Sequence, residues 1–250
     1  MKAWIATLGA AACVTMPVAA AAQTGDSQTG TRLTYKSGKD SKSLGDRAVV
    51  QAVQRWAECV YQKRDRTVIR MLTTVDVDDL ENAAELVYKD VACDLYVKGS
   101  NADNFALNTS FATDRGLFAE AALKSKGDLR SSATVPEALP MSEGYNRAWF
   151  AMTTRSNTVD AMAICFAETQ PSLTLELLRS DRKSPEENAA IGNIAAVLGD
   201  CLSAGASLNA NAFELRNALA EAYFQRLYGT NEPMALAQPE EETAAAGAEG

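Results

Sequence analysis

Two stretches that share one pattern decide the fold of this chain: RGLFAEA at residues 115–121 and RNALAEA at residues 216–222. Both read Arg-x-x-apolar-Ala-Glu-Ala, and they lie 101 positions apart. Three further landmarks repeat in the same order at offsets of 106 to 108: a cysteine in AECV (57–60) and AICF (163–166), a short apolar run, and a second cysteine. One match arises easily by chance, whereas four matches in one order indicate a tandem duplication.

Apolar residues recur at spacings of three and four through both halves, which is the pattern of amphipathic helices. In the first helix, for example, Val49, Val53, Trp56 and Val60 form one apolar stripe. The stretch SPEE (184–187) marks a helix start, because it combines a capping box with proline at the first helical position. The pattern therefore predicts four helices in each half, at about residues 49–60, 66–73, 78–99 and 114–126, and at 157–168, 171–178, 185–202 and 211–228.

We therefore predict an all-α fold, built from two tandemly duplicated four-helix modules that each contain one disulfide. Two arrangements stay open: the modules face each other around a pseudo-twofold axis, or they stack in tandem. Both ends of the chain are polar and bury too little apolar surface to fold. The predicted order is a signal peptide (1–22), a flexible polar arm (23–45), module 1 (46–127), a linker (128–155), module 2 (156–229) and a disordered acidic tail (230–250).

The first 22 residues are typical of a cleavable secretory signal. Lys2 supplies a positive start, residues 3–19 are apolar and small, and three alanines precede Gln23. A membrane span fits less well, because the run is rich in alanine and polar residues follow it at once. A lipoprotein with Cys13 as its lipidated residue is a further alternative, but the alanines before Cys13 lack the usual leucine. We expect a periplasmic or secreted protein whose mature chain has no transmembrane segment.

Removal of the signal leaves four cysteines, and an even number is typical of disulfides in an exported chain. Each half has one cysteine on its first helix and one near the end of its third helix, 34 and 36 positions apart. Since a duplicated unit most simply duplicates its bridge, we predict the pairs Cys59–Cys93 and Cys165–Cys201. Each bridge stabilises the fold by about 3 to 4 kcal/mol in the chain-entropy model. A thiol nucleophile is the alternative, and without histidine it needs lysine, arginine or a helix N-terminus to activate it.

The composition excludes several classes of function. The chain has no histidine, which removes the commonest general base and the commonest zinc ligand. With 24 Lys and Arg against 32 Asp and Glu, it lacks the positive balance that binding of nucleic acid requires. We therefore predict no metal, no cofactor and no nucleic-acid partner, and we assign no catalytic residue.

Two short motifs resemble known sites but are incomplete. The acidic run at residues 76–81 lacks the glycine and the distant glutamate of a calcium loop. We interpret this run as a helix start at which Asp78 caps free amides. Ser180 and Lys183 have the spacing of a serine–lysine pair, but no other element of such a site is present.

The repeated motif supplies the candidate site residues Arg115, Glu120, Arg216 and Glu221. In each copy the arginine and the glutamate are five positions apart, about 140° around a helix, so they do not share a face. We interpret them as structural contacts, in which the arginine reaches a neighbouring helix end and the glutamate bonds a partner across the bundle. In the functional alternative, the two arginines recognise an anion twice.

The two modules also resemble a known group of proteins. The resemblance rests on an alanine two positions before a cysteine, a short Leu-rich helix, a second cysteine about 35 residues on, and R-x-x-L-A-E-A. This pattern is similar to that of an uncharacterised family of small exported bacterial proteins with a duplicated Cys-containing helical module. The resemblance implies a helical fold and export, and it brings no activity with it.

We expect a non-catalytic protein that acts as an interaction or ligand-binding module and presents helix faces or the groove between its modules. The partner is a protein or a small ligand that the sequence does not identify. The alternative is a carboxylate-based hydrolase of the cell envelope, a chemistry that needs no histidine. Paired acids with raised pKa in one pocket favour the enzyme, whereas a groove of apolar side chains and arginines favours binding.

Overall fold

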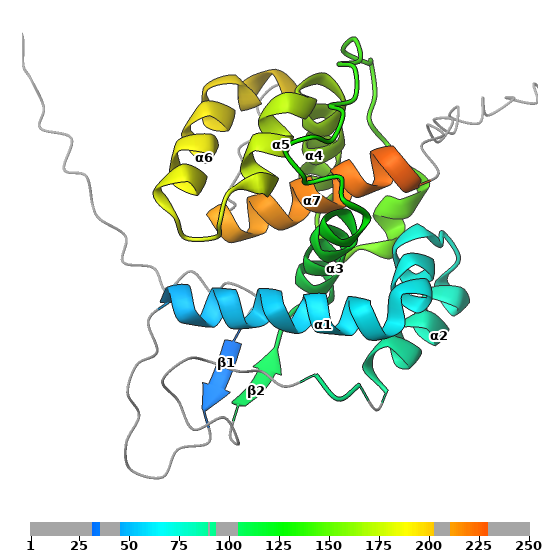
Figure 1. Ribbon diagram of the computed structural model, residues 1–250. Helices are drawn as coiled ribbons and strands as arrows, with labels where there is room; N and C mark the ends of the chain where they lie inside the picture. The colour runs from blue at the N-terminus through cyan, green and yellow to red at the C-terminus, as the bar shows by residue number, and fades with distance from the viewer. Residues whose placement is uncertain (1–31, 36–45, 90, 94–104, 203–210, 230–250) are drawn as a thin grey trace, which may run out of the picture.

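The structure, a computed structural model, describes residues 32–35, 46–89, 91–93, 105–202 and 211–229. Within these residues the chain is mainly helical (Figure 1), which confirms the predicted all-α class. No helix in this part of the chain is long and apolar enough to cross a membrane. The helices are α1 (Asp46–Thr73), α2 (Val77–Tyr88), α3 (Phe111–Lys126), α4 (Asn157–Thr169), α5 (Pro171–Arg179), α6 (Pro185–Val197) and α7 (Ala212–Tyr228), with short 3₁₀ helices η2 (Ala148–Met152) and η3 (Leu198–Cys201).

Helix α1 runs through the two helices that the sequence predicts at 49–60 and 66–73. It is kinked at Arg64, whose backbone angles are φ −136° and ψ 32°. Gln170, between α4 and α5, has a similar backbone, with φ −127° and ψ 52°. There Pro171 begins a new helix, because proline lacks the N–H that would continue α4. No proline stands at the kink of α1, but the non-helical backbone at Arg64 divides it into two helical segments, as the prediction of two helices requires.

The third helix of each half ends earlier than predicted. Helix α2 stops at Tyr88, before Cys93, and Asp76 rather than Asp78 caps its start by accepting from the Asp79 amide. Helix α6 ends at Val197, and η3 continues the chain to Cys201. The predicted helices therefore extend too far, since a helix signal in sequence marks ends poorly.

Both predicted disulfides are present. Cys59 and Cys93 are bonded with their Cα atoms 5.9 Å apart, and Cys165 and Cys201 with their Cα atoms 5.6 Å apart. Each bridge ties the first helix of its half to the segment that follows the third helix. The bridges therefore hold α1 to the end of α2, and α4 to η3.

Two short strands form an antiparallel ribbon that the sequence analysis did not predict. Strand β1 (Arg32–Tyr35) pairs with β2 (Phe105–Asn108) so that Arg32 lies opposite Asn108 and Tyr35 opposite Phe105. Strand β1 belongs to the arm that was expected to be flexible. The predicted signal peptide with Cys13, the rest of the arm and the acidic tail lie outside the described residues.

 Of that arm, the structure describes residues 32–35 alone.

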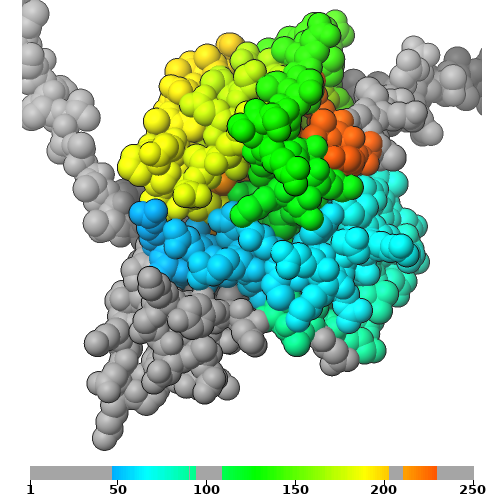
Figure 2. All heavy atoms as spheres, in the orientation of Figure 1, coloured from blue at the N-terminus to red at the C-terminus, as the bar shows by residue number. Residues whose placement is uncertain are grey.

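The linker of residues 128–155 lies against the second half of the chain. Its Leu139 amide donates to the Glu168 carbonyl at 2.8 Å, and Arg226 donates to the Glu137 carbonyl. In Figure 2 the green surface, which includes this segment, lies beside the yellow helices and above the blue α1. Trp149 and Phe150 are buried in η2, which is separate from α4.

Helices α3 and α7 cross in the middle of the molecule, with α1 and α2 on the side of α3 and α4 to α6 on the side of α7 (Figure 1). The crossing is close because α3 has a glycine there: a Cβ on Gly116 would lie 2.5 Å from the Asn217 Cβ. One cluster of buried apolar side chains runs through both halves, and it includes Phe118, Phe166 and Phe224. The two halves therefore share a single core.

Candidate functional site

The repeated motif places its charged residues at the crossing of α3 and α7, and it pairs them between the two copies. The Arg115 Nε donates to Glu221 Oε1 at 2.6 Å. Arg216 donates to both oxygens of Glu120, at 2.7 Å from Nη2 and 3.2 Å from Nε. Each arginine is thus bonded to the glutamate of the other copy, and all four side chains are buried.

The same arginines bind the carbonyl ends of two helices. Arg115 donates to the carbonyl oxygens of Met71 and Leu72 at 2.6 and 3.0 Å, at the end of α1. Arg216 donates to the Leu178 carbonyl at 3.1 Å, at the end of α5. The last carbonyls of a helix have no partner inside the helix and carry its negative dipole end, so a buried guanidinium satisfies them well. This is the arrangement that the structural interpretation of the motif describes.

Each buried glutamate also accepts from a second arginine that the sequence analysis did not single out. Arg155, just before α4, donates to Glu221. Arg182, in the loop between α5 and α6, donates to Glu120. Neither arginine belongs to the repeated motif. Arg182 lies between Ser180 and Lys183, which were considered only as a serine–lysine pair. The signal that points to them is indirect: a fully buried carboxylate needs several donors.

These contacts keep both glutamates ionised. Burial by itself raises the pKa of Glu120, but Arg182 and Arg216 outweigh it and lower the pKa to about 2. The pKa of Glu221 is also lowered, because Arg115 and Arg155 outweigh its burial. A carboxylate held in this way is a poor proton donor near neutral pH, so neither glutamate suits general acid catalysis.

Two buried aspartates have a raised pKa, and in both the largest cause is burial. Asp114 accepts from the Tyr88 hydroxyl at 2.6 Å and from Thr109. Asp160 accepts from Arg155 Nε at 2.7 Å and from the Thr153 hydroxyl at 2.5 Å. Each aspartate thus has its own separate set of partners, and the two do not form a carboxylate pair.

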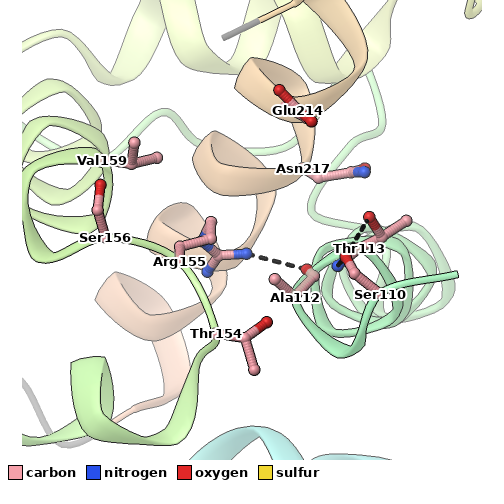
Figure 3. Close-up of a pocket in the computed structure, with 9 residues that line it drawn as sticks. All are labelled: Ser110, Ala112, Thr113, Thr154, Arg155, Ser156, Val159, Glu214 and Asn217. Carbon is pink, nitrogen blue, oxygen red and sulfur yellow. Dashed lines mark hydrogen bonds between the residues drawn. The ribbon is translucent and has the colours of Figure 1, made fainter. Parts of the chain in front are cut away.

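A pocket of about 270 Å³ lies where α3, α4 and α7 begin (Figure 3). In Figure 3, Arg155 extends from the α4 side toward the Ala112 carbonyl of α3, to which its Nη1 donates at 3.0 Å. The pocket thus lies between the first half, through α3, and the second half, through α4 and α7. Its lining residues are Ser110, Ala112, Thr113, Thr154, Arg155, Ser156, Val159, Glu214 and Asn217.

The lining combines four hydroxyl groups, two small apolar side chains, one guanidinium, one carboxylate and one amide side chain. Of the residues that line it, Glu214 alone is acidic. Of the four residues predicted as motif contacts, none lines the pocket, although Glu221 lies directly behind Arg155. The described part of the chain holds no cluster of three or more His, Cys, Asp or Glu side chains suited to a metal ion.

No family model, no curated protein and no solved structure matches the chain.

Proposed function

We propose that this chain is an exported, non-catalytic helical protein that binds a small ligand in the pocket between its two halves. The observation that carries the proposal is the lining of that pocket, which joins an arginine, small apolar side chains and hydroxyl groups around a single carboxylate. Ligand pockets typically combine apolar walls with a few polar groups that orient the ligand. Its volume of about 270 Å³ suits a small metabolite.

The alternative of a carboxylate-based hydrolase has less support. Such enzymes use two carboxylates on either side of the bond that they cleave. Only Glu214 among the pocket residues could serve in this way. The buried glutamates Glu120 and Glu221 are neutralised by arginines, which favours a structural role for them.

We further propose that the two halves are copies of one four-helix module that face each other around a pseudo-twofold axis at the crossing of α3 and α7. Three pairs of features support this proposal. The disulfides span 34 and 36 residues, non-helical backbone occurs at Arg64 and at Gln170, and the motif arginines exchange glutamates between the halves. In this view, α1 corresponds to α4 and α5 together.

Export is supported by the two disulfides, since such bonds persist in oxidising compartments outside the cytosol. Determining the mature N-terminus of the protein recovered from the periplasm or the medium tests this part of the proposal. We expect cleavage before Gln23. Recovery of the full-length chain from the cytosol contradicts it.

Ligand binding is tested by a thermal-shift screen of small polar metabolites against the exported protein. Val159 lines the pocket, so we expect Val159→Trp to fill it and abolish any shift. Val77→Trp is the matched control, because Val77 is an exposed valine in the first turn of α2. A screen without a hit, or hits that both variants retain, contradicts the proposal. Hydrolysis of chromogenic glycosides that is lost in Glu214→Gln supports the enzyme instead.

A further inference from the structure

The linker of residues 128–155 contains an exposed segment that lies against the second disulfide. Residues 137–144 are all exposed and form neither helix nor strand, and Figure 1 shows this part of the linker as the green loop above α4. The segment is fixed near both ends to Glu168, in the last turn of α4. The Leu139 amide donates to the Glu168 carbonyl at 2.8 Å, and Arg147 donates to the Glu168 carboxylate at 3.0 Å. The loop therefore keeps a defined position over α4.

Met141 lies between these two anchors and contacts the bridge directly. Its sulfur atom is 3.6 Å from the Sγ of Cys165, which is bonded to Cys201. The Tyr145 hydroxyl donates to the same methionine sulfur at 3.4 Å. Met141 is 53% exposed, whereas Cys165 is 0% exposed. A thioether at the surface thus covers one sulfur atom of a buried disulfide.

The other methionines of the described residues lie in the interior. Met71, Met152 and Met162 are at most 3% exposed. Oxidation of a sulfur atom depends on its exposure to dissolved oxidants. Within the described ranges, Met141 is therefore the methionine that an oxidant reaches without local unfolding.

We propose that Met141 is an oxidation site that controls the access of thiols to the Cys165–Cys201 bridge. The oxidant is a hydroperoxide, which transfers one oxygen atom to the thioether. The O–O bond breaks, an S–O bond forms, and water or an alcohol leaves. The sulfur atom gives up two electrons, and the side chain becomes a sulfoxide.

Oxidation of Met141 changes the contacts that its side chain favours. Before oxidation, the apolar thioether is in van der Waals contact with Cys165. A sulfoxide is polar, and holding its oxygen against sulfur atoms without a hydrogen-bond donor costs free energy. The oxygen binds water or the Tyr145 hydroxyl instead, so the side chain moves away from Cys165.

The uncovered sulfur of Cys165 is then open to a dithiol. One thiolate of the dithiol attacks the Cys165 Sγ, forms a mixed disulfide and releases Cys201 as a thiolate. The second thiolate displaces Cys165, so the dithiol becomes a disulfide, and its two electrons and two protons pass to the cysteines. The Cys59–Cys93 bridge belongs to the first half, and both of its cysteines are already partly exposed, so oxidation of Met141 leaves its rate of reduction unchanged.

The experiment treats the purified exported protein, with both bridges formed, with hydrogen peroxide. Peptide mass spectrometry measures the oxidation of each methionine, and alkylation of free thiols during exposure to dithiothreitol measures the reduction of each bridge. We expect Met141 to be oxidised at least about tenfold faster than Met71 and Met162. In the oxidised protein, the Cys165–Cys201 bridge should be reduced at least about tenfold faster than in the untreated protein, and the Cys59–Cys93 bridge at the same rate.

Two variants at the same position sharpen the test. Met141→Leu keeps an apolar side chain of similar size but has no sulfur to oxidise, so peroxide should no longer accelerate reduction of the Cys165–Cys201 bridge. Met141→Gln places a polar side chain over the bridge, and it should accelerate the reduction without peroxide.

Oxidation of Met141 no faster than that of the buried methionines overturns the inference, as does an unchanged rate of reduction of the Cys165–Cys201 bridge after oxidation. Faster reduction of both bridges, or acceleration by peroxide that persists in Met141→Leu, also overturns it. The comparison of treated with untreated wild-type protein needs no mutation, so the test stands even if a variant does not fold.

Discussion

The two buried glutamates of the repeated motif stand in comparable surroundings. The Glu221 cluster consists of Glu221 with Arg115, Arg155 and Asp160, and the Glu120 cluster of Glu120 with Arg216, Arg182, Glu187 and Asn217. In both, a fully buried carboxylate lies between one motif arginine and one arginine from a loop. Arg216 and Arg115 each also bind helix-end carbonyls.

The clusters differ in how completely their donors are used. Every nitrogen of Arg155 donates a hydrogen bond, to Asp160, Ala112 or Glu221. In Arg182, Nη2 donates to Glu120 and Asn217, whereas Nε and Nη1 find no partner within the described ranges. Burial lowers the pKa of Arg182 despite the nearby Glu120. In the Glu221 cluster, every side-chain nitrogen of the two arginines therefore donates at least one hydrogen bond. In the Glu120 cluster, two nitrogen atoms of Arg182 and the Nδ2 of Asn217 have no partner among the described residues.

This difference coincides with the edge of the proposed binding site. Asn217 belongs to the Glu120 cluster and also lines the pocket, so the incomplete cluster is the one that continues into the proposed binding site. Proteins tend to leave buried polar groups without hydrogen-bond partners at functional sites and to satisfy them elsewhere. The following variants test whether the two clusters differ in this way, in order of expected effect.

Glu120→Gln should destabilise the protein most, by about 3 to 5 kcal/mol, because it leaves two buried arginines without their shared carboxylate. Glu221→Gln should cost roughly 1 kcal/mol less, since Arg155 keeps Asp160 and the Ala112 carbonyl, whereas Arg182 in the other cluster keeps only Asn217. Urea unfolding of both variants measures the difference. A larger loss of unfolding free energy in Glu221→Gln than in Glu120→Gln would contradict the prediction that the Glu120 cluster depends more on its central carboxylate.

Gly116→Ala should destabilise by about 3 kcal/mol, because the added Cβ would lie within 2.7 Å of the Cβ, O and Cα atoms of Asn217. The change forces α3 and α7 apart and so strains both clusters together. Gly192→Ala is the control: it lies within α6 with no atom near the added Cβ, and it should stabilise by about 0.5 to 1 kcal/mol. Thermal unfolding of both variants checks the prediction, and equal effects would contradict it.

Acid should weaken the fold through Glu120. Its folded pKa of about 2 lies below the ordinary value of 4.5, so its stabilisation is present above pH 4.5 and is lost as pH falls toward 2. The loss amounts to about 2 to 3 kcal/mol, and Glu221 adds to it in the same direction. Urea unfolding at pH 5 and pH 2.5 should show a smaller change in Glu120→Gln than in the wild type. The same change in both would show that Glu120 does not carry the effect.

Exchange of the loop arginines gives the smallest expected effects and the most direct comparison. Arg155→Met should destabilise by about 2 kcal/mol, because it removes a donor from both Asp160 and Glu221. Arg182→Met should cost about 1 kcal/mol, because Glu120 keeps both bonds from Arg216 and two unsatisfied donors disappear. Chemical denaturation of the pair measures the gap. Equal losses would mean that Arg182 is as fully bonded as Arg155.

The helices and the bridges could be predicted because they depend on local pattern and on repetition. Apolar spacing located α3, α4, α5 and α7 to within a few residues. The similar order of landmarks in the two halves of the sequence selected the cysteine pairs, and both bridges are present. The ends of α2 and α6 were placed too late, because the backbone at those points responds to packing as well as to propensity.

The pocket and the loop arginines could not be predicted in the same way. Arg155 and Arg182 lie 27 positions apart in sequence and act on glutamates 66 and 62 positions from them. Asn217 looks like a routine substitution for the glycine at the matching place in the first copy. Its position against Gly116 and beside Arg182 follows only from the crossing of α3 and α7.

The sequence by itself determined the helical class, the disulfide pairing and which four charged residues occur in the two similar motifs, because helix periodicity and the order of motifs can be read from the chain alone. The tertiary structure decided which charges meet, which donors stay unsatisfied and where the pocket forms. The contacts between charges and the position of the pocket depend on how α3 and α7 cross. Burial at that crossing makes the interaction between opposite charges stronger than it would be at the surface.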